Sequence, residues 1–196
     1  MVEGSTDIGG TRTSISMQAA EVLGIGVENF IPTVGDTDTA GYADVTGGSR
    51  TTYATGFAAV KAAENLIEVL KERCAIIWSL DKNDIDFRDG TFYASKDPEL
   101  KFSFKDLASN LDNTGGPASS TGSVDLESAG GAFGTHIVDV DVDPDTGKTD
   151  VARYTVVQDV GTAIYPAYVK GQMAGGAVQG IGSVSYTHLR AHETDS

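Results

Sequence analysis

Three segments of the sequence place glycines just ahead of hydroxyl side chains or of a proline that suits the first turn of a helix. They read DIGGTRTS at residues 7–14, DVTGGSRTT at 44–52 and DVGTAIYP at 159–166. Glycine adopts backbone conformations that other residues avoid, and a helix that starts after such a turn exposes unpaired N–H groups and a partial positive charge. Helix N-termini of this kind bind phosphate and other anions. The three segments are therefore candidate anion-binding turns, with Arg12 and Arg50 as local positive charges.

The same pattern also suits ordinary tight turns that cap a helix. In the first segment the cap would come from Thr11, Thr13 or Ser14. None of the segments has the phosphate-loop spacing GxxxxGK[ST], and none has GxGxxG after a strand. The pattern alone thus leaves the anion-binding and structural interpretations open.

The acidic run Asp139, Asp141, Asp143 and Asp145 invites comparison with a calcium-binding loop. Pro144 stands where that loop needs glycine and Asp150 where it needs glutamate. Residues two apart share one face of a strand, so we interpret the run as the solvent face of a strand. We expect a structural role for His136.

Helices must position these residues. Each of the segments 7–24, 44–74 and 159–182 is expected to contain a glycine-rich turn followed by a helix, and in the first two the apolar residues recur at intervals of three and four. The first two would bury the residues Ile15, Ala19, Val22 and Leu23, and Ala59, Ala63, Leu66, Ile67 and Leu70. Pro166 suits the first turn of the third helix, and Cys74 is expected to be a small buried side chain following the second.

The remaining chain alternates between strands and loops. Asp89-Gly90 predicts a hairpin in 84–95, and PDTG predicts a turn between two long strands in 133–161. Segment 27–45 begins as a strand and becomes a polar loop, 102–111 can form a short helix, and 111–131 is a loop without a core. The predicted fold class is α+β, with mixed helices and β-hairpins.

Composition excludes several classes of function. The chain carries 28 acidic against 14 basic residues, a net charge of −14, which would repel a nucleic acid. Its single cysteine rules out an internal disulfide framework. No apolar run is long enough to span a membrane, and residue 1 does not open a basic, apolar signal sequence, so we expect a cytoplasmic location.

The segments GSTDIGGTRTS, DVTGGSRTTYATG and QDVGTAIYPAYVKGQMAGGAVQGIG, in this order, resemble the molybdopterin-binding large subunit of the xanthine dehydrogenase and aldehyde oxidase family. The likeness extends over nearly all of residues 1–182. It implies that the chain is an incomplete piece of the molybdenum-cofactor-binding domains, about a quarter of a full subunit. The beginning and the end of the chain are both expected to be cuts.

The resemblance implies a set of cofactor-binding residues, carried over position by position. They are Gly9, Gly10, Thr11, Arg12, Gly48, Ser49, Arg50, Thr51, Thr52 and Gln172. Two positions depart from the family pattern: Gly9 replaces a glutamine, which puts one cofactor contact in doubt, and Tyr165 replaces the asparagine before Pro166. No residue would ligate the metal directly, because the cofactor's dithiolene holds it.

The implied activity is oxidative hydroxylation of an aldehyde, a purine or an N-heteroaromatic compound. The cofactor would be molybdopterin, or its cytosine dinucleotide, with molybdenum. The general-base glutamate of a Gly-Glu motif would lie downstream, so we expect no catalytic residue here and no activity from this piece alone. Iron-sulfur and FAD subunits would be partners. The alternatives are a carbon monoxide dehydrogenase-type member and a non-catalytic interaction module whose glycine turns are structural.

The last residues change in character. VSYTHLRAHET, residues 184–194, is identical to a one-frame translation of the transposase adapter used in sequencing libraries. We therefore predict that residues 1–183 are the genuine segment and 184–196 a non-native tail. His188 and His192, four residues apart, would otherwise suggest metal ligands on one helix face.

Overall fold

The structure is a computed structural model, which describes residues 1–5, 10–35, 38, 40–127 and 130–185. The helices are α1 (Thr11–Leu23), α2 (Thr51–Trp78), α3 (Phe104–Ala108) and α4 (Pro166–Ser185). The strands are β1 (Val2–Glu3), β2 (Thr33–Val34), β3 (Ile85–Arg88), β4 (Thr91–Ala94), β5 (Asp97–Ser103), β6 (Phe133–Val142) and β7 (Thr149–Asp159). This mixture of helices and hairpins confirms the predicted α+β class. The chain divides into two units, Met1–Ala129 and Gly130–Ser196.

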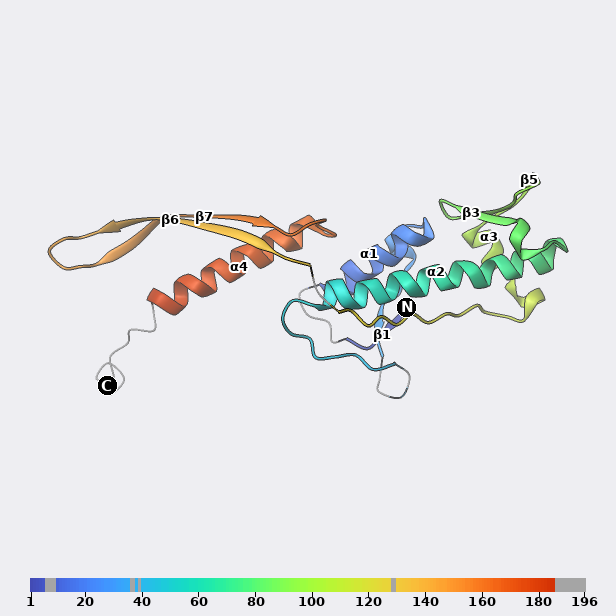
Figure 1. Ribbon diagram of the computed structural model, residues 1–196, viewed down its shortest axis with the longest axis horizontal. Coiled ribbons are helices and arrows are strands. Elements are labelled where there is room, and N and C mark those ends of the chain that lie inside the picture. The colour runs from blue at the N-terminus through green and yellow to red at the C-terminus, as the bar shows by residue number, and fades with distance from the viewer. Residues whose placement is uncertain (6–9, 36–37, 39, 128–129, 186–196) are drawn as a thin grey trace. The chain divides into compact units, whose positions relative to one another are not determined.

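Helices α1 and α2 lie side by side in the first unit (Figure 1). As the spacing predicted, α1 turns Ile15, Ala19 and Leu23 inward and ends before Gly24. Ala19 and Leu23 pack on Ala63 of α2 in one apolar cluster. Small residues at this contact let the two helix backbones approach closely.

Helix α2 is longer than the sequence predicted. It runs through Cys74 to Trp78, so the expectation that Cys74 follows the helix was wrong. The residues after Cys74 continue the helical spacing, and the helix stops where Ser79 takes a left-handed conformation with φ 55°. Cys74 is fully buried in a second apolar cluster, beside Phe92 and Leu107.

A three-stranded antiparallel sheet, in the order β3-β4-β5, covers this C-terminal half of α2. The hairpin predicted around Asp89-Gly90 joins β3 to β4, and β5 was not predicted. Segment 27–45 does not begin as a strand. Val27–Asn29 forms a 3₁₀ turn, and within the described part of this segment only β2 pairs, in parallel, with β1.

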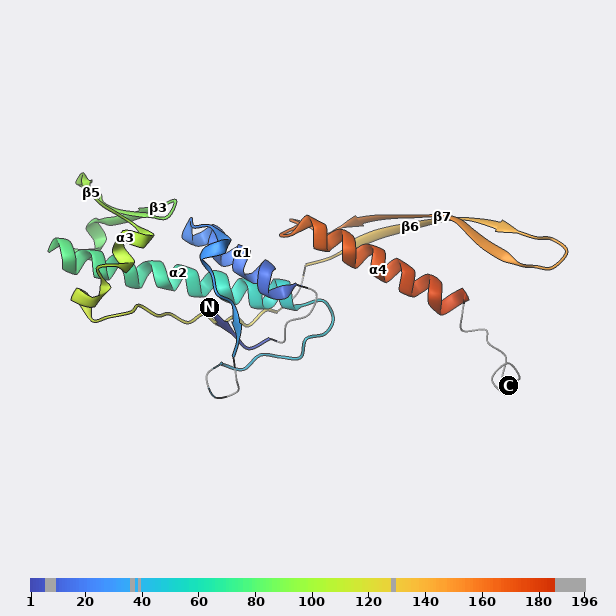
Figure 2. The same cartoon turned by 180° about the vertical axis from the view of Figure 1, so that it is seen from behind.

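The loop after α3 is ordered against α2. Its residues 118–124, here called the strap, have no regular structure but run along the helix in both views (Figures 1 and 2). The Ser120 hydroxyl donates to the Ala62 carbonyl at 2.7 Å, and the Asn65 amide donates to the Thr121 carbonyl at 2.8 Å. A Cβ on Gly122 would overlap the backbone of Ala58 and Ala62, so only glycine fits there.

The second unit consists of the β6–β7 hairpin and α4, seen from behind in Figure 2. The two long strands confirm the prediction for 133–161, with an irregularity in register at Asp139/Val140. Among the described residues, none of the helices combines the length and apolarity needed to cross a membrane.

Candidate functional site

The first two glycine turns lie at the same end of the α1–α2 pair. The Ser14 and Thr52 hydroxyl oxygens are 3.4 Å apart, and the side-chain amide of Gln18 donates to the Thr52 carbonyl at 3.0 Å. Further along, Ala19 meets Ala63. The helices are therefore parallel, with their N-termini together. The chain just after β1 enters the same region, because the buried Ser5 hydroxyl lies 2.7 Å from that of Thr55.

Left-handed backbone precedes both helices. Gly10 has φ 83°, and Gly48 and Ser49 have φ 63° and 60°. The N-cap residues are Gly10 and Arg50, neither of which has a side-chain acceptor. The expectation that Thr11, Thr13 or Ser14 caps α1 was wrong, because the helix already starts at Thr11. The Ser14 hydroxyl instead donates back to the Thr11 carbonyl at 3.2 Å.

The turn before α2 leaves polar groups and space for a ligand. Thr51 is 4% exposed, and its hydroxyl has no hydrogen-bond partner among the described residues. A buried hydroxyl without a partner is costly, which marks the position as one that a ligand can satisfy. A Cβ on Gly47 or Gly48 would meet nothing within 4 Å. The turn can therefore admit a bulky group close to its backbone.

The two arginines differ in their surroundings. Arg50 folds over its own loop, where Nε donates to the Val45 carbonyl at 2.7 Å and Nη2 to that of Asp44. Its guanidinium thereby shapes the turn and keeps a positive charge next to the start of α2. Arg12 is exposed in the first turn of α1. Neither α1 nor α2 has an acidic residue in its first turn.

Gln172 lies in the second unit, exposed on α4. Val169, Met173 and Ala177 line a groove with β7, whereas Gln172 does not. A Cβ on Gly171 or on Gly175 would meet nothing within 4 Å. The meeting of Gln172 with the other turns stays a prediction, and Gly9 lies outside the described residues.

Other reactive side chains have structural explanations. Burial raises the pKa of the Cys74 thiol to about 12. His136 Nδ1 lies 2.9 Å from the Tyr154 hydroxyl across the hairpin. The pKa of Asp143 is lowered because its carboxylate accepts hydrogen bonds from Thr146 and from the Asp145 N–H, and so organises the turn. Within 1–5, 10–35, 38, 40–127 and 130–185, no three His, Cys, Asp or Glu residues could hold a metal ion.

Comparison with known proteins extends this picture. The profile of the molybdopterin cofactor-binding domain matches residues 1–196. The chain is 30% identical to the nicotine 6-hydroxylase large subunit of Paenarthrobacter nicotinovorans, over 92% of its own length and 23% of that protein. It is also 30% identical to the carbon monoxide dehydrogenase large chain of Hydrogenophaga pseudoflava, over 87% and 22%. The chain spans about a quarter of the length of these relatives.

Solved structures of two enzymes share the fold of this chain. The Cu,Mo-CO dehydrogenase in its carbon monoxide reduced state superposes with a TM-score of 0.75 at 28% identity, covering 89% of this chain and 23% of that one. Quinoline 2-oxidoreductase from Pseudomonas putida 86 superposes with a TM-score of 0.73 at 28% identity, covering 91% and 24%. Because the profile match covers its full length and its fold is shared with these enzymes, the chain belongs to the molybdopterin cofactor-binding domain family and is a fragment of the xanthine dehydrogenase type.

Proposed function

We propose that this chain is the cofactor-binding segment of a molybdenum hydroxylase large subunit, which oxidatively hydroxylates an aldehyde, a purine or an N-heteroaromatic compound. The observation that carries the proposal is the parallel α1–α2 pair, which brings two uncapped glycine turns together. Relatives of the chain include a nicotine 6-hydroxylase large subunit and a xanthine dehydrogenase molybdenum-binding subunit, which supports the reaction class.

The electrostatics of the helix pair favour an anionic ligand. Parallel neighbouring helices set their positive N-terminal ends side by side, and an anion at that end offsets their repulsion. The chain as a whole has a net charge of −14 and would repel an anion. Oriented backbone N–H groups with Arg12 and Arg50 close by supply the positive potential locally. A pterin cofactor with phosphate groups is such a ligand.

Each set of residues has a separate binding role. Gly9, Gly10 and Thr11 would hold one part of the cofactor at the start of α1, with Arg12 beside them. Gly48, Ser49 and Thr52 would line the second turn, where the unsatisfied hydroxyl of Thr51 can bond to the ligand. Gln172 would donate its side-chain amide to the pterin from α4. The bound molybdopterin supplies the molybdenum centre for substrate oxidation, while these residues bind and orient it.

We further propose that the bound form is molybdopterin or its cytosine dinucleotide and that the enzyme is cytoplasmic. Iron-sulfur and FAD subunits carry the electrons away from the large subunit. Two relatives have names that describe parts of larger assemblies, a large subunit and subunit gamma of a dehydrogenase complex, which supports partner subunits.

The second glycine turn gives the direct test. In the full-length subunit, Gly48→Val should abolish retention of molybdenum and pterin, because a side chain would fill the open space beside the turn. Gly147→Val is the matched control, since Gly147 also has positive φ, at 72°, and open space around it. Metal analysis and pterin extraction measure retention, and circular dichroism measures folding. Full occupancy in Gly48→Val would contradict the proposal.

Gln172→Ala tests the contribution of α4. Loss of one hydrogen bond to the cofactor should weaken cofactor binding by about 1 to 3 kcal/mol, less than the loss in Gly48→Val. The cofactor's rate of release from the purified subunit measures the effect. An unchanged rate would remove Gln172 from the site and leave the two turns in place.

The carbon monoxide dehydrogenase-type alternative rests on 30% identity to the large chain of that enzyme, equal to the identity with nicotine 6-hydroxylase. Turnover of the holoenzyme with carbon monoxide, hypoxanthine, an aldehyde and quinoline as separate substrates distinguishes the two reaction classes. Carbon monoxide oxidation without turnover of the other compounds would favour the alternative.

A further inference from the structure

We propose that Gln18 is a positioning residue, which fixes the N-termini of α1 and α2 in register for the cofactor. This inference rests on the proposed function. Gln18 was absent from the residues singled out in the sequence. It lies about two helical turns into α1, and its contacts reach both helices.

The side-chain amide of Gln18 serves two backbone carbonyls. Its nitrogen donates to the Thr52 carbonyl of α2 at 3.0 Å and to the Ser14 carbonyl of α1 at 3.3 Å. A primary amide has two hydrogens, so it can make both bonds. One side chain thus connects the first turn of α2 to the first turn of α1.

Gly56 makes room for this bridge. It is buried in α2, and a Cβ there would overlap the terminal atoms of Gln18. Glycine inside a helix is intrinsically unfavourable by about 1 kcal/mol relative to alanine. The close approach of Gln18 explains why glycine, and not a residue with a side chain, occupies position 56 inside this long helix.

The bridge matters for binding because the two turns act together. The Ser14 and Thr52 hydroxyls, 3.4 Å apart, make a weak direct link between the helix starts. Apolar contacts between the helices lie further along, at Ala19, Leu23 and Ala63. These contacts are non-directional and allow small sliding movements. A directed bond near the turns fixes the spacing between the two sets of backbone N–H groups, and Gln18 supplies it.

The test uses the full-length subunit with Gln18→Met, which keeps the length of the side chain and removes the amide. We expect cofactor release to become roughly tenfold faster, as for one lost hydrogen bond. Gln158→Met is the control, because it makes the same chemical change on the β6–β7 hairpin. Hydrogen exchange should rise in peptides 11–18 and 51–56 and stay unchanged in the C-terminal half of α2.

A double-mutant cycle provides a second test. Gly56→Ala should displace the amide and reproduce the faster cofactor release while Gln18 is present. In a Gln18→Ala background the same substitution should have no further effect, since the side chain that it would strike is gone. If the losses of cofactor retention in Gln18→Ala and Gly56→Ala add up in the double variant, the two residues do not act through one contact and the proposed bridge is wrong.

Cofactor content of the wild type tests the proposed function, and cofactor release from the Gln18→Met variant tests the role of Gln18. A wild-type subunit without molybdenum or pterin would overturn both. A loaded wild type together with a Gln18→Met variant that releases cofactor at the wild-type rate would overturn only the role of Gln18. Exchange that rises evenly over all of α1 and α2 would reveal a general loss of stability and would also overturn the positioning role.

Discussion

Among single residues, Thr51 and Cys74 show opposite uses of burial on the same helix. The Thr51 hydroxyl is buried at the start of α2 without a protein partner among the described residues, which suits a ligand contact. The Cys74 thiol is fully buried six turns later among apolar side chains. Position along the helix decides which of the two residues can contact a ligand, because Thr51 lies beside the open glycine turn and Cys74 lies in the packed half.

Cys74 should be unreactive in the folded protein. Desolvation by burial raises its pKa to about 12, so the thiol stays protonated at neutral and mildly alkaline pH. We expect iodoacetamide at pH 8 to leave Cys74 unlabelled in the native full-length subunit and to label it in urea. Peptide mass analysis identifies the site. Rapid native labelling of Cys74 would contradict its placement in the core.

Among the elements, the strap depends on close backbone contact with α2. Gly122→Ala would push a methyl group into the Ala58 and Ala62 backbone, so we expect a loss of roughly 2 kcal/mol in the free energy of unfolding. Gly130→Ala is the control, because a Cβ there meets nothing within 4 Å. Thermal unfolding and limited proteolysis after residue 117 measure the effect. Equal stability of the two variants would show that the strap does not pack as described.

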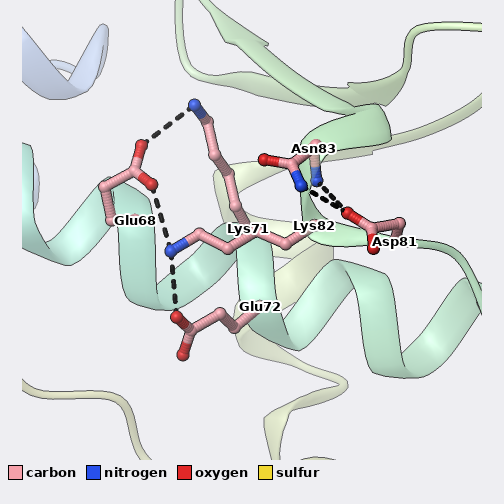
Figure 3. A network of polar contacts seen from close by, with 6 residues as sticks. All are labelled: Glu68, Lys71, Glu72, Asp81, Lys82 and Asn83. Carbon is pink, nitrogen blue, oxygen red and sulfur yellow. Dashed lines mark hydrogen bonds and ion pairs between the residues drawn. The ribbon is translucent and has the colours of Figure 1, made fainter.

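An exposed ion-pair network ties α2 to the 3₁₀ turn Lys82–Asp84 that follows it (Figure 3). Lys82 Nζ lies 2.9 Å from Glu72 and 3.1 Å from Glu68, and Lys71 lies 3.0 Å from Glu68. Hydrogen bonds from Lys71 and Lys82 lower the pKa of Glu68, and hydrogen bonds to Glu72 and Glu68 raise the pKa of Lys82. Glu68 therefore stays ionised to a lower pH, and Lys82 to a higher pH, than each would without its partners.

This network predicts a small pH dependence of stability. Glu68 contributes above its unfolded pKa, and the contribution is lost as the pH falls through its lower folded value. Lys82 contributes below its unfolded pKa and loses this contribution as the pH rises through its raised folded value. We expect Lys82→Met to lower the melting temperature slightly at pH 7 and to flatten its acid decline. Lys101→Met is the control, and roughly 1 M salt should remove the difference. A difference that persists in high salt would exclude an ionic origin.

The elements show where sequence reasoning succeeded and where it could not. Apolar periodicity located α1, Pro166 located the start of α4, and the turn residues Asp89-Gly90 and PDTG located the two hairpins. It ended α2 too early, since no glycine or proline marks the stop after Trp78. It could not identify Gln18, whose role comes from α2, or the ordering of the strap, which depends on small residues meeting a distant helix backbone. Contacts between distant segments leave no local pattern in a single sequence.

At the scale of the whole molecule, the two units differ in how completely they bury their apolar residues. The first unit encloses Phe92, Leu107 and Leu70, each at most 3% exposed. In the described part of the second unit, Ala177 is the one buried apolar residue. Large apolar side chains of that unit are exposed to solvent, among them Phe133, Ile137, Val142, Val157 and Val178. These side chains need a covering surface that the unit itself does not supply.

We therefore predict that residues 1–183, expressed alone without the proposed adapter-derived tail 184–196, do not unfold as one cooperative domain. Exposed apolar residues of the hairpin and α4 should bind a fluorescent apolar dye, and protease should cut within 130–183 before it cuts α2. The full-length subunit is the control, in which the same segments should resist cleavage. Calorimetry decides the matter, because a cooperative 183-residue domain would show a heat capacity change of about 2.5 kcal/mol/K. Such a transition in 1–183 would mean that the second unit closes its own core.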